Sequence, residues 1–358
     1  MEESLQKLHQ LPQSLLAWYD GCARVLPWRD EPTAYHVWVS EIMLQQTRVS
    51  AVLPYYQRFM EALPDVQALA EAEEGRLMKL WEGLGYYNRA RNLQKAARMI
   101  EEEFGGRFPE NYETLLTLPG VGEYTAGAIA SIAFGQRVSA VDGNVLRVVA
   151  RITGDRGDVL DARVKARFRA WVEEILPAQR CGDFNQALME LGAVVCVPNG
   201  APRCERCPAA AFCTARAEGS WENLPVKKKK APRRREEKTV FVLLRGKALA
   251  LRRRPEQGLL AGLWEFPNVE GFLDERAAAA QVERWNLMPR AWMRQLAARH
   301  IFTHVEWHMR CYLLRAEGAG PQDFCWTDAA ALGERAVPAA FGKFLEAARP
   351  YLTEEEEL

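Results

Sequence analysis

The first candidate for a chemical role in this 358-residue chain is a glutamate that lies among apolar residues. Glu41 lies in the string VWVSEIMLQQT, residues 37–47. On a helix, its neighbours three and four positions away would be Val37, Trp38, Leu44 and Gln45. Three apolar neighbours should desolvate the carboxyl and raise its pKa, which suits a general acid near neutral pH. The alternative is a glutamate held by a salt bridge at a domain seam.

A second carboxyl candidate, Asp142, lies in the string AVDGNVLRVVAR, residues 140–151. It follows apolar Ala140 and Val141, at the position where a new helix should begin. An aspartate there can simply accept backbone hydrogen bonds as an N-cap. Capping and catalysis are compatible, however, and Asn144 could hold the carboxylate by hydrogen bonding.

Between these two acids runs LPGVGEYTAGAIASIAFG, residues 118–135. One helix should end at Leu118 and the next should begin near Glu123. The turn between them consists of Gly120, Val121 and Gly122. Its uncovered backbone N–H groups and the helix N-terminus can bind a DNA phosphate whatever the base sequence. An ordinary helical hairpin would explain a bare Gly-x-Gly, but the whole string is typical of a helix-hairpin-helix motif.

Four cysteines fall within one short segment in the pattern C-x7-C-x2-C-x5-C, namely Cys196, Cys204, Cys207 and Cys213. Thiolates at these spacings can converge on one [4Fe–4S] cluster or on one zinc ion. Structural zinc ligands usually come as two close pairs, about two to four residues apart within each pair. The longer gaps here favour the iron–sulfur cluster, and zinc is the alternative.

The elements that must position these residues change character near residue 225. Before that point apolar residues recur at spacings of three and four, and no convincing alternating strand is present. The helical period is clear at 77–84, 93–104 and 164–176. We therefore expect an all-α domain over residues 1–223, which includes the cysteine loop 196–213.

Beyond the helical part, residues 224–238 read LPVKKKKAPRRREEK. This basic segment with little apolar content fits an exposed interdomain linker, and contact with the DNA backbone is the alternative. Strands are then expected at 239–244, 248–252, 264–266 and 307–314, with helices at 277–282 and 339–347. The pattern predicts an α+β domain over 239–350 and an acidic tail over 351–358.

Charge and hydropathy limit the classes of function. Basic and acidic residues number 47 each, so bulk charge gives no support for nucleic-acid binding. Any DNA site must therefore come from local placement of charge. No apolar run is long enough to span a membrane, and the N-terminus lacks a signal-peptide core. We expect a cytoplasmic monomer, associated with the nucleoid if the source is bacterial.

The string LPGVGEYTAG, the aspartate of VDGN and the trailing cysteines resemble the endonuclease III superfamily of DNA glycosylases. Four further strings resemble its adenine DNA glycosylase (MutY) branch: LPWR at 26–29, WVSEIMLQQTRV at 38–49, WEGLGYYNRARNL at 81–93 and FNQALMELGA at 184–193. The resemblance covers residues 10–226 and extends into the C-terminal domain. One departure is the gap between Cys196 and Cys204, where seven residues replace the family's usual six.

The resemblance implies roles for individual residues. Glu41 would protonate the adenine as it leaves, Asp142 would stabilise the sugar cation or bond to it transiently, and Asn144 would orient Asp142. The pocket of the extruded adenine would be lined by Arg24, Trp28, Arg29, Leu44 and Gln186. The gap beside the opposite base would be filled or probed by Gln46, Thr47, Leu84 and Tyr86. An aromatic plane such as Tyr86 can replace a lost stacking partner.

Position 124 separates the subtypes of the superfamily. Relatives that also cleave the DNA strand carry a lysine there, and its amine forms a Schiff base with the sugar. This chain has Tyr124, and a phenol cannot form that imine. The resemblance therefore implies a monofunctional glycosylase that leaves an abasic site.

The C-terminal strings GLLAGLWEFPN, at 258–268, and HIFTHVEWHMRCYLL, at 300–314, resemble a Nudix-like domain that reads 8-oxoguanine. No acidic R-E-x-x-E-E helix for magnesium is present, so we expect a reader without hydrolase activity. The recognition loop would be Phe302, Thr303 and His304, where the family commonly has Phe-Ser-His. A threonine hydroxyl can still distinguish the N7 donor and O8 acceptor of 8-oxoguanine. Alternatively, His304 is an ordinary turn residue and Phe302 a core residue.

These observations predict a base excision repair glycosylase that carries one [4Fe–4S] cluster. Its substrate would be duplex DNA with adenine opposite 8-oxoguanine or guanine, and its action would prevent G:C to T:A transversions. Three other functions are less consistent with the residues. A bifunctional pyrimidine glycosylase-lyase would need lysine at 124, and a DNA-binding module without activity would not need Glu41 and Asp142 together. A Nudix hydrolase would need the missing acidic helix.

Overall fold

The computed structural model describes residues 2–228 and 232–353, which form two compact units. Of the described residues, 2–71 and 92–228 form the first unit, and 72–91 and 232–353 form the second. A stretch of 20 residues from the helical half of the sequence, 72–91, therefore belongs to the same unit as the C-terminal part.

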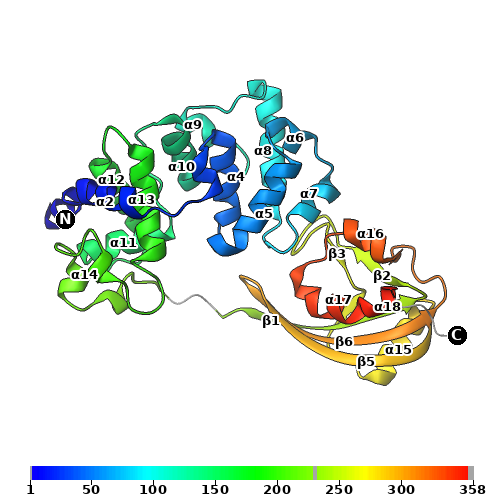
Figure 1. Ribbon diagram of the computed structural model, residues 1–358. Coiled ribbons are helices and arrows are strands. Elements are labelled where there is room, and N and C mark those ends of the chain that lie inside the picture. Colours follow the sequence, from blue (N-terminus) through cyan, green and yellow to red (C-terminus); the bar gives the residue numbers. More distant parts are fainter. Residues whose placement is uncertain (1, 229–231, 354–358) are drawn as a thin grey trace. The chain divides into compact units, whose positions relative to one another are not determined.

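The described residues of the first unit form helices and no strand, which confirms the predicted all-α domain (Figure 1). Its helices are α1 (Glu2–His9), α2 (Leu11–Cys22), α3 (Pro27–Asp30), α4 (Ala34–Leu44), α5 (Val49–Ala62), α6 (Val66–Glu71), α8 (Asn88–Phe104), α9 (Tyr112–Leu115), α10 (Glu123–Phe134), α11 (Gly143–Thr153), α12 (Ala162–Ile175), α13 (Cys181–Val194) and α14 (Thr214–Ala217). Helix α9 ends at Leu115, before the expected Leu118, and α10 begins at Glu123 as expected.

Apolar faces of α1, α2, α11, α12 and α13 form one continuous core in this unit. Helix α10 packs beside it with almost no space between backbones. A Cβ atom on Gly127 would lie 2.1 Å from the carbonyl oxygen of Ser139, in the segment that leads into α11. A Cβ atom on Gly182 of α13 would lie 2.6 Å from the carbonyl oxygen of Ser131. Glycine is thus required for α10 to approach both neighbours.

The second unit is an α+β fold, also as predicted. Its elements are α7 (Glu74–Leu80), β1 (Arg234–Arg245), β2 (Ala248–Arg253), β3 (Trp264–Glu265), β4 (Asn268–Glu270), α15 (Glu275–Arg284), β5 (Met288–Ile301), β6 (Val305–Glu317), β7 (Cys325–Thr327), α16 (Ala329–Glu334), α17 (Gly342–Ala348) and α18 (Pro350–Thr353). The sheet order is β3-β2-β1-β6-β5, with β4 beside β1 and β7 beside β2. Helices α17 and α18 cover one face and α15 covers the other (Figure 1).

The sequence analysis did not expect strands β4, β5 and β7, and it placed the start of β1 too late. Strand β1 begins at Arg234, inside the segment 224–238 that the composition indicates as a linker, because residues 234–238 pair in parallel with 305–309 of β6. Strand β5 is a largely exposed sheet edge, and two register shifts between Pro289 and Arg294 break the alternation that would have revealed it.

The middle of the linker segment and most of the tail segment fall outside the described residues, which exclude residues 1, 229–231 and 354–358. Lys229, Lys230 and the acidic residues Glu354–Glu357 belong to these ranges. Within the described part of the chain, we find no helix with the length and apolar content needed to cross a membrane.

The close packing at Gly127 gives a prediction about stability. Gly127→Ala should lower the free energy of unfolding by about 1–3 kcal/mol, because its methyl group would overlap a buried backbone carbonyl. Gly21→Ala in α2 is the matched control, since nothing lies within 4 Å of a Cβ there, and it should be neutral or slightly stabilising. Equal denaturation midpoints for the two variants would contradict this account of the packing.

Candidate active site

Helix α4 presents Glu41 to the interior of the first unit, where only 7% of the residue is exposed. Burial raises the pKa of the Glu41 carboxyl to about 7, and the negative charge of Asp142 acts in the same direction. A hydrogen bond from the hydroxyl of Tyr124 and the positive charge of Arg29 oppose the rise. Glu41 is therefore a carboxyl that can hold a proton close to neutral pH.

Tyr124 lies in the first turn of α10, directly after the glycine turn. Its hydroxyl donates to Glu41 and lies 3.0 Å from Met189 Sδ. Burial raises the pKa of the phenol well above its ordinary value, and the charges of Glu41 and Asp142 add to the rise. The phenol is therefore neutral and serves as a hydrogen-bond donor to Glu41.

Asp142 is the N-cap of α11 and is partly exposed. Its Oδ1 accepts from the backbone N–H groups of Asn144 and Val145, both at 2.8 Å, and its Oδ2 accepts from Asn144 Nδ2 at 2.7 Å. Burial raises the pKa of this carboxyl, while the three hydrogen bonds act against the rise. Asp142 thus caps the helix, and the same hydrogen bonds stabilise its carboxylate.

Buried Arg147 connects this N-cap to the segment of the cysteines. Its Nη2 donates to Asn144 Oδ1 and to the carbonyl of Gly192, both at 2.8 Å, and its Nε donates to the carbonyl of Cys196 at 2.8 Å. A Cβ atom on Gly192 would lie 2.6 Å from Asn144 Cβ, so glycine allows α13 to approach α11 at this point. The sequence analysis did not identify Arg147, whose partners are mostly backbone carbonyls.

Fully buried Asn185 fixes the chain just before Asp142. Its Oδ1 accepts from the backbone N–H of Ala140 at 3.0 Å, and its Nδ2 donates at 2.9 Å to Ser131 Oγ and to the carbonyl of Val138. The amide therefore links α13, α10 and the segment that leads into α11. Asn185 is a second positioning residue that the sequence analysis missed.

Two of the residues expected around the adenine, Arg24 and Arg29, converge on a residue that was not expected, Glu190. Arg24 Nε and Nη2 donate to its two carboxylate oxygens at 2.6 and 2.8 Å, and Arg29 Nη2 donates at 2.9 Å. Arg29 Nε also donates to Gln186 Oε1 at 3.1 Å. Burial alone would raise the pKa of Glu190, but the two guanidinium groups hold it below its ordinary value. Its spacing of four from Gln186, on one face of α13, was the available signal.

The remaining expected residues of this region lie on or beside α3 and α4. Trp28 is buried and packs edge-on against Tyr56 at a centroid distance of 5.2 Å. Leu44 is half-buried at the end of α4. Gln46 is exposed with a left-handed φ of 59°, and Thr47 is half-buried beside it.

The glycine turn before α10 leaves the helix N-terminus without a side-chain cap. Gly120 has a φ of 77°, and a Cβ atom there would lie 2.7 Å from Asn92 Cβ. Val121 is buried, and Gly122 is the N-cap residue of the 12-residue helix. Uncapped N–H groups at the positive end of a helix can bind a phosphate by donating hydrogen bonds to its oxygens.

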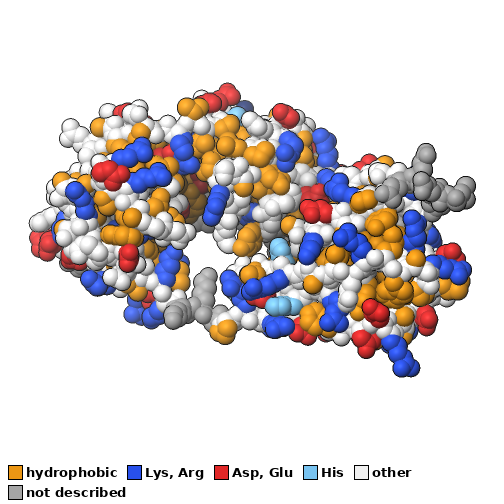
Figure 2. Space-filling model, turned by 60° about the horizontal axis from the view of Figure 1, so that its bottom comes forward, with side chains coloured by type: hydrophobic (Ala, Val, Ile, Leu, Met, Phe, Trp, Pro, Cys, Tyr) orange, Lys and Arg blue, Asp and Glu red, His pale blue; other side chains and the backbone are white. Residues whose placement is uncertain are grey.

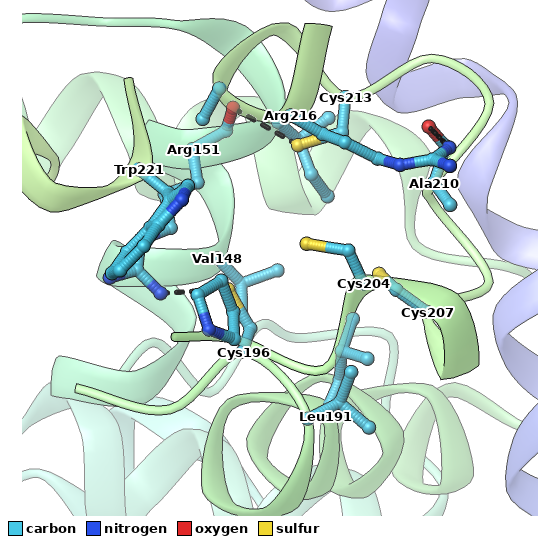
Figure 3. Close-up of a pocket in the computed structure, with 14 residues that line it drawn as sticks. Val148, Arg151, Leu191, Cys196, Cys204, Cys207, Ala210, Cys213, Arg216 and Trp221 are labelled. Carbon is cyan, nitrogen blue, oxygen red and sulfur yellow. Dashed lines mark hydrogen bonds between the residues drawn. The ribbon is translucent and has the colours of Figure 1, made fainter. Parts of the chain in front are cut away.

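The four clustered cysteines line one pocket at the end of α11 and α13, together with Val148, Arg151, Leu191 and Trp221 (Figure 3). Arg151 Nη1 donates to Cys196 Sγ at 3.3 Å, and Cys213 Sγ lies 3.4 Å from the carbonyl of Arg151. Among the described residues, no group of three or more His, Cys, Asp or Glu side chains is arranged to hold one metal ion. Four thiols spread around a common pocket fit a multinuclear cluster better than a single zinc ion.

In the second unit, Tyr86 is exposed and Leu84 is buried. Tyr86 has a left-handed φ of 50° and lies in the turn after α7, so the turn presents its ring to solvent. Of these two residues expected beside the opposite base, only Tyr86 is free to meet DNA without rearrangement.

The turn between β5 and β6 carries the expected recognition loop. Thr303 and His304 are exposed at its tip, while Phe302 packs against His300 and Trp307 with ring centroids 4.6 and 4.8 Å apart. Phe302 thus supports the loop from the core side.

On the face shown in Figure 2, basic and acidic side chains are interspersed, in agreement with the neutral net charge.

Family models and known proteins match both parts of the chain. The family of HhH-GPD superfamily base excision DNA repair proteins matches residues 39–174, and the NUDIX domain family matches residues 239–347. Adenine DNA glycosylase of Homo sapiens is 40% identical, over 86% of this chain and 67% of the human protein. The Rattus norvegicus enzyme is 38% identical, over 86% and 71%. That of Buchnera aphidicola subsp. Acyrthosiphon pisum is 33% identical, over 85% and 86%.

Solved structures resemble the helical part. A thermostable thymine-DNA glycosylase is 30% identical with a TM-score of 0.55, over 60% of this chain and 98% of that one. A non-covalent endonuclease III–DNA complex is similar in fold, with 23% identity and a TM-score of 0.51, over 59% and 97%.

Proposed function

The chain belongs to the adenine DNA glycosylase family, and we propose that it removes adenine paired with 8-oxoguanine or guanine in duplex DNA. It is a base excision repair enzyme that hydrolyses N-glycosidic bonds. The observation that carries the proposal is the pair of carboxyls, buried Glu41 and partly exposed Asp142, in different hydrogen-bonding environments. Removal of the mispaired adenine would prevent G:C to T:A transversions.

The two carboxyls would act in sequence on one glycosidic bond. Glu41, which has a pKa of about 7, donates its proton to a ring nitrogen of adenine as the base leaves. Asp142 accepts three hydrogen bonds and Glu41 one, and these bonds favour the ionised form of Asp142 against the effect of burial. Its negative charge stabilises the cation that develops on the sugar, and water then completes the hydrolysis. Asn144 holds Asp142 in place for this role.

The adenine pocket would be formed by Arg24, Trp28, Arg29, Leu44 and Gln186. Glu190 fixes both guanidinium groups by ion pairs. Because Arg29 occupies the Gln186 oxygen, the amide NH2 group of Gln186 remains to donate to the acceptor nitrogens of adenine.

We propose that the enzyme is monofunctional. The position that would need an amine for strand cleavage carries Tyr124, whose neutral phenol is committed to Glu41. Tyr124 would contribute to catalysis by setting the proton affinity of Glu41. The product is then an abasic site with an intact strand.

DNA would be held at several places by groups with different tasks. The backbone N–H groups of Gly120, Val121 and Gly122 would bind a phosphate. Tyr86, with Gln46, Thr47 and Leu84, would occupy the space left by the extruded base. Thr303, supported by Phe302 and flanked by His304, would read the N7 donor and O8 acceptor of 8-oxoguanine.

We propose that Cys196, Cys204, Cys207 and Cys213 hold one [4Fe–4S] cluster. Arg151, which donates to Cys196 Sγ, would stabilise the negative charge of the bound thiolates. When bound, the cluster would cross-link the loop 196–213 through its thiolates.

The purified protein should contain about four iron and four inorganic sulfide per chain. Cys207→Ser should lower both, because it removes one ligand, whereas Cys22→Ser, outside the pocket, should change neither. Zinc at one equivalent without sulfide would refute the cluster.

The pKa of Glu41 predicts a pH dependence of catalysis. The protonated carboxyl is the active form, so the single-turnover rate of adenine release should fall as pH rises through about 7. Glu41→Gln should lose this ionisation and about 10²–10⁴-fold in rate. Glu61→Gln, on the exposed face of α5, should keep the wild-type profile. An unchanged profile in Glu41→Gln would discard the role.

Duplexes of defined mispairs test the proposed function as a whole. The enzyme should release adenine from A:8-oxoguanine and A:G duplexes and leave an A:T duplex intact. The strand should break only after alkali treatment, since no amine is available for a Schiff base. Borohydride trapping of a covalent complex at the level of a true lyase would contradict the monofunctional mechanism.

A further inference from the structure

Residues 72–91 fall inside the family match at 39–174 but belong to the second unit with residues 232–353. This segment contains α7 and the turn that presents Tyr86. Tyr86 therefore shares a unit with Thr303. The contacts that hold the segment in this unit decide where Tyr86 stands relative to that loop.

Lys79 is the first of these contacts. Its Nζ donates to the carbonyls of Leu332 and Arg335, at 3.4 and 3.1 Å, at the end of α16. Carbonyls at a helix C-terminus lack intrahelical partners and carry the negative end of the helix dipole, so a lysine there is favourable. Side-chain exposure of Lys79 is 32%, which limits competition from water.

Glu82 completes the arrangement from the same turn of chain. Its Oε1 accepts from the backbone N–H of Val337 at 2.7 Å, and its Oε2 pairs with Lys79 Nζ at 2.6 Å. Both oxygens of one carboxylate are thus engaged, and each bond is charge-assisted. We call this pair the Lys79–Glu82 clamp.

The turn that follows the clamp is stiff. Arg89 Nη2 donates to the carbonyls of Leu84 and Gly85, at 3.2 and 3.1 Å, and its guanidinium lies 5.5 Å from the centre of the Tyr86 ring. After the turn, Arg91 Nη2 donates to the carbonyl of Ala261 at 2.6 Å. The turn is therefore anchored at both ends and braced in the middle.

At its tip, the hydroxyl of Tyr86 lies 3.3 Å from Thr303 Oγ1. Both residues are exposed, so this single contact cannot hold the two loops together. Their proximity must come from the part-buried, charge-assisted contacts at the base of the turn.

We propose that Lys79 and Glu82 are positioning residues for recognition of the base opposite adenine. They hold the Tyr86 turn and the Thr303 loop as one body, so that the aromatic wedge and the hydroxyl reader meet the same nucleotide together. This inference rests on the proposed function. Without the clamp both loops can still contact DNA, but they must first be ordered relative to each other. The binding energy of the correct mispair is then used to order the loops and no longer favours the correct mispair over others.

The test compares single-turnover adenine release from A:8-oxoguanine and A:G duplexes, with active enzyme titrated. Lys79→Met and Glu82→Leu should each lower the ratio of the two rates by about fivefold or more. Lys79→Arg and Glu82→Gln keep a donor and an acceptor and should restore most of the ratio. Arg290→Met, which breaks an exposed ion pair with Glu317 in the same unit, is the matched control and should leave the ratio unchanged.

A Thr303→Ala background gives a second comparison. The clamp substitutions should change the ratio far less there, because coupled residues are not additive. Ratios that stay within twofold of wild type in Lys79→Met and Glu82→Leu, or effects that multiply fully with Thr303→Ala, would overturn the inference. Wild-type protein that releases no adenine from either duplex would refute the proposed function instead.

Hydrogen exchange of the DNA-free protein tests the clamp independently of activity. Exchange of the backbone N–H of Val337 and of the turn at 84–89 should accelerate roughly tenfold in Glu82→Leu. The same rates in Glu82→Leu and wild type would show that the clamp does not hold the turn, whatever the substrate.

Discussion

The hydrogen bond from Tyr124 to buried Glu41, beside the second carboxyl of Asp142, is the constraint on which the first unit depends. Two acids in one apolar site cannot both ionise cheaply, so each is favoured in its neutral form. The fold gives them different surroundings, with three hydrogen-bond donors and the charge of Arg147 at Asp142, and the phenol of Tyr124 and the charge of Arg29 at Glu41. In the proposed mechanism, this difference in surroundings would separate the acid from the anion.

That difference requires backbone held to within a few tenths of an ångström. The capping donors of Asp142 exist only if α11 begins at Gly143, and the start of α11 is fixed by its neighbours. Gly127 lets α10 touch the segment before it, Asn185 ties that segment to α13, and Arg147 holds Asn144 from the other side. These residues have no chemical role of their own. They hold the backbone and side-chain donors that bond to Asp142, and those hydrogen bonds act against the rise of its pKa on burial.

The sequence was informative wherever the signal is local. Helical periodicity predicted the all-α unit, and three apolar neighbours on one helix predicted the burial of Glu41. It gave no signal where the hydrogen-bond or ion-pair partner of a residue is far away in the chain or is a backbone group. Glu190 is defined by Arg24 and Arg29, more than 160 residues earlier, and Arg147 by carbonyls that any residue could supply. Strand β5 was not predicted, because its register shifts break the alternation of apolar and polar residues that identifies a strand.

The same reasoning explains why residues 72–91 read as part of the helical domain and yet belong to the second unit. Helix α7 has an ordinary amphipathic sequence, and nothing in it marks Lys79 or Glu82 as ligands of backbone groups some 250 residues later. A domain boundary predicted from periodicity assigns each continuous stretch of sequence to one domain, whereas a structural unit is defined by contacts between residues that can be far apart in the chain. The consequence concerns specificity. The sequence places Tyr86 among the catalytic motifs, whereas the contacts place it in one unit with Thr303. In the proposed function, the reading that these two residues perform would therefore belong to the second unit and not to the helices that carry Glu41 and Asp142.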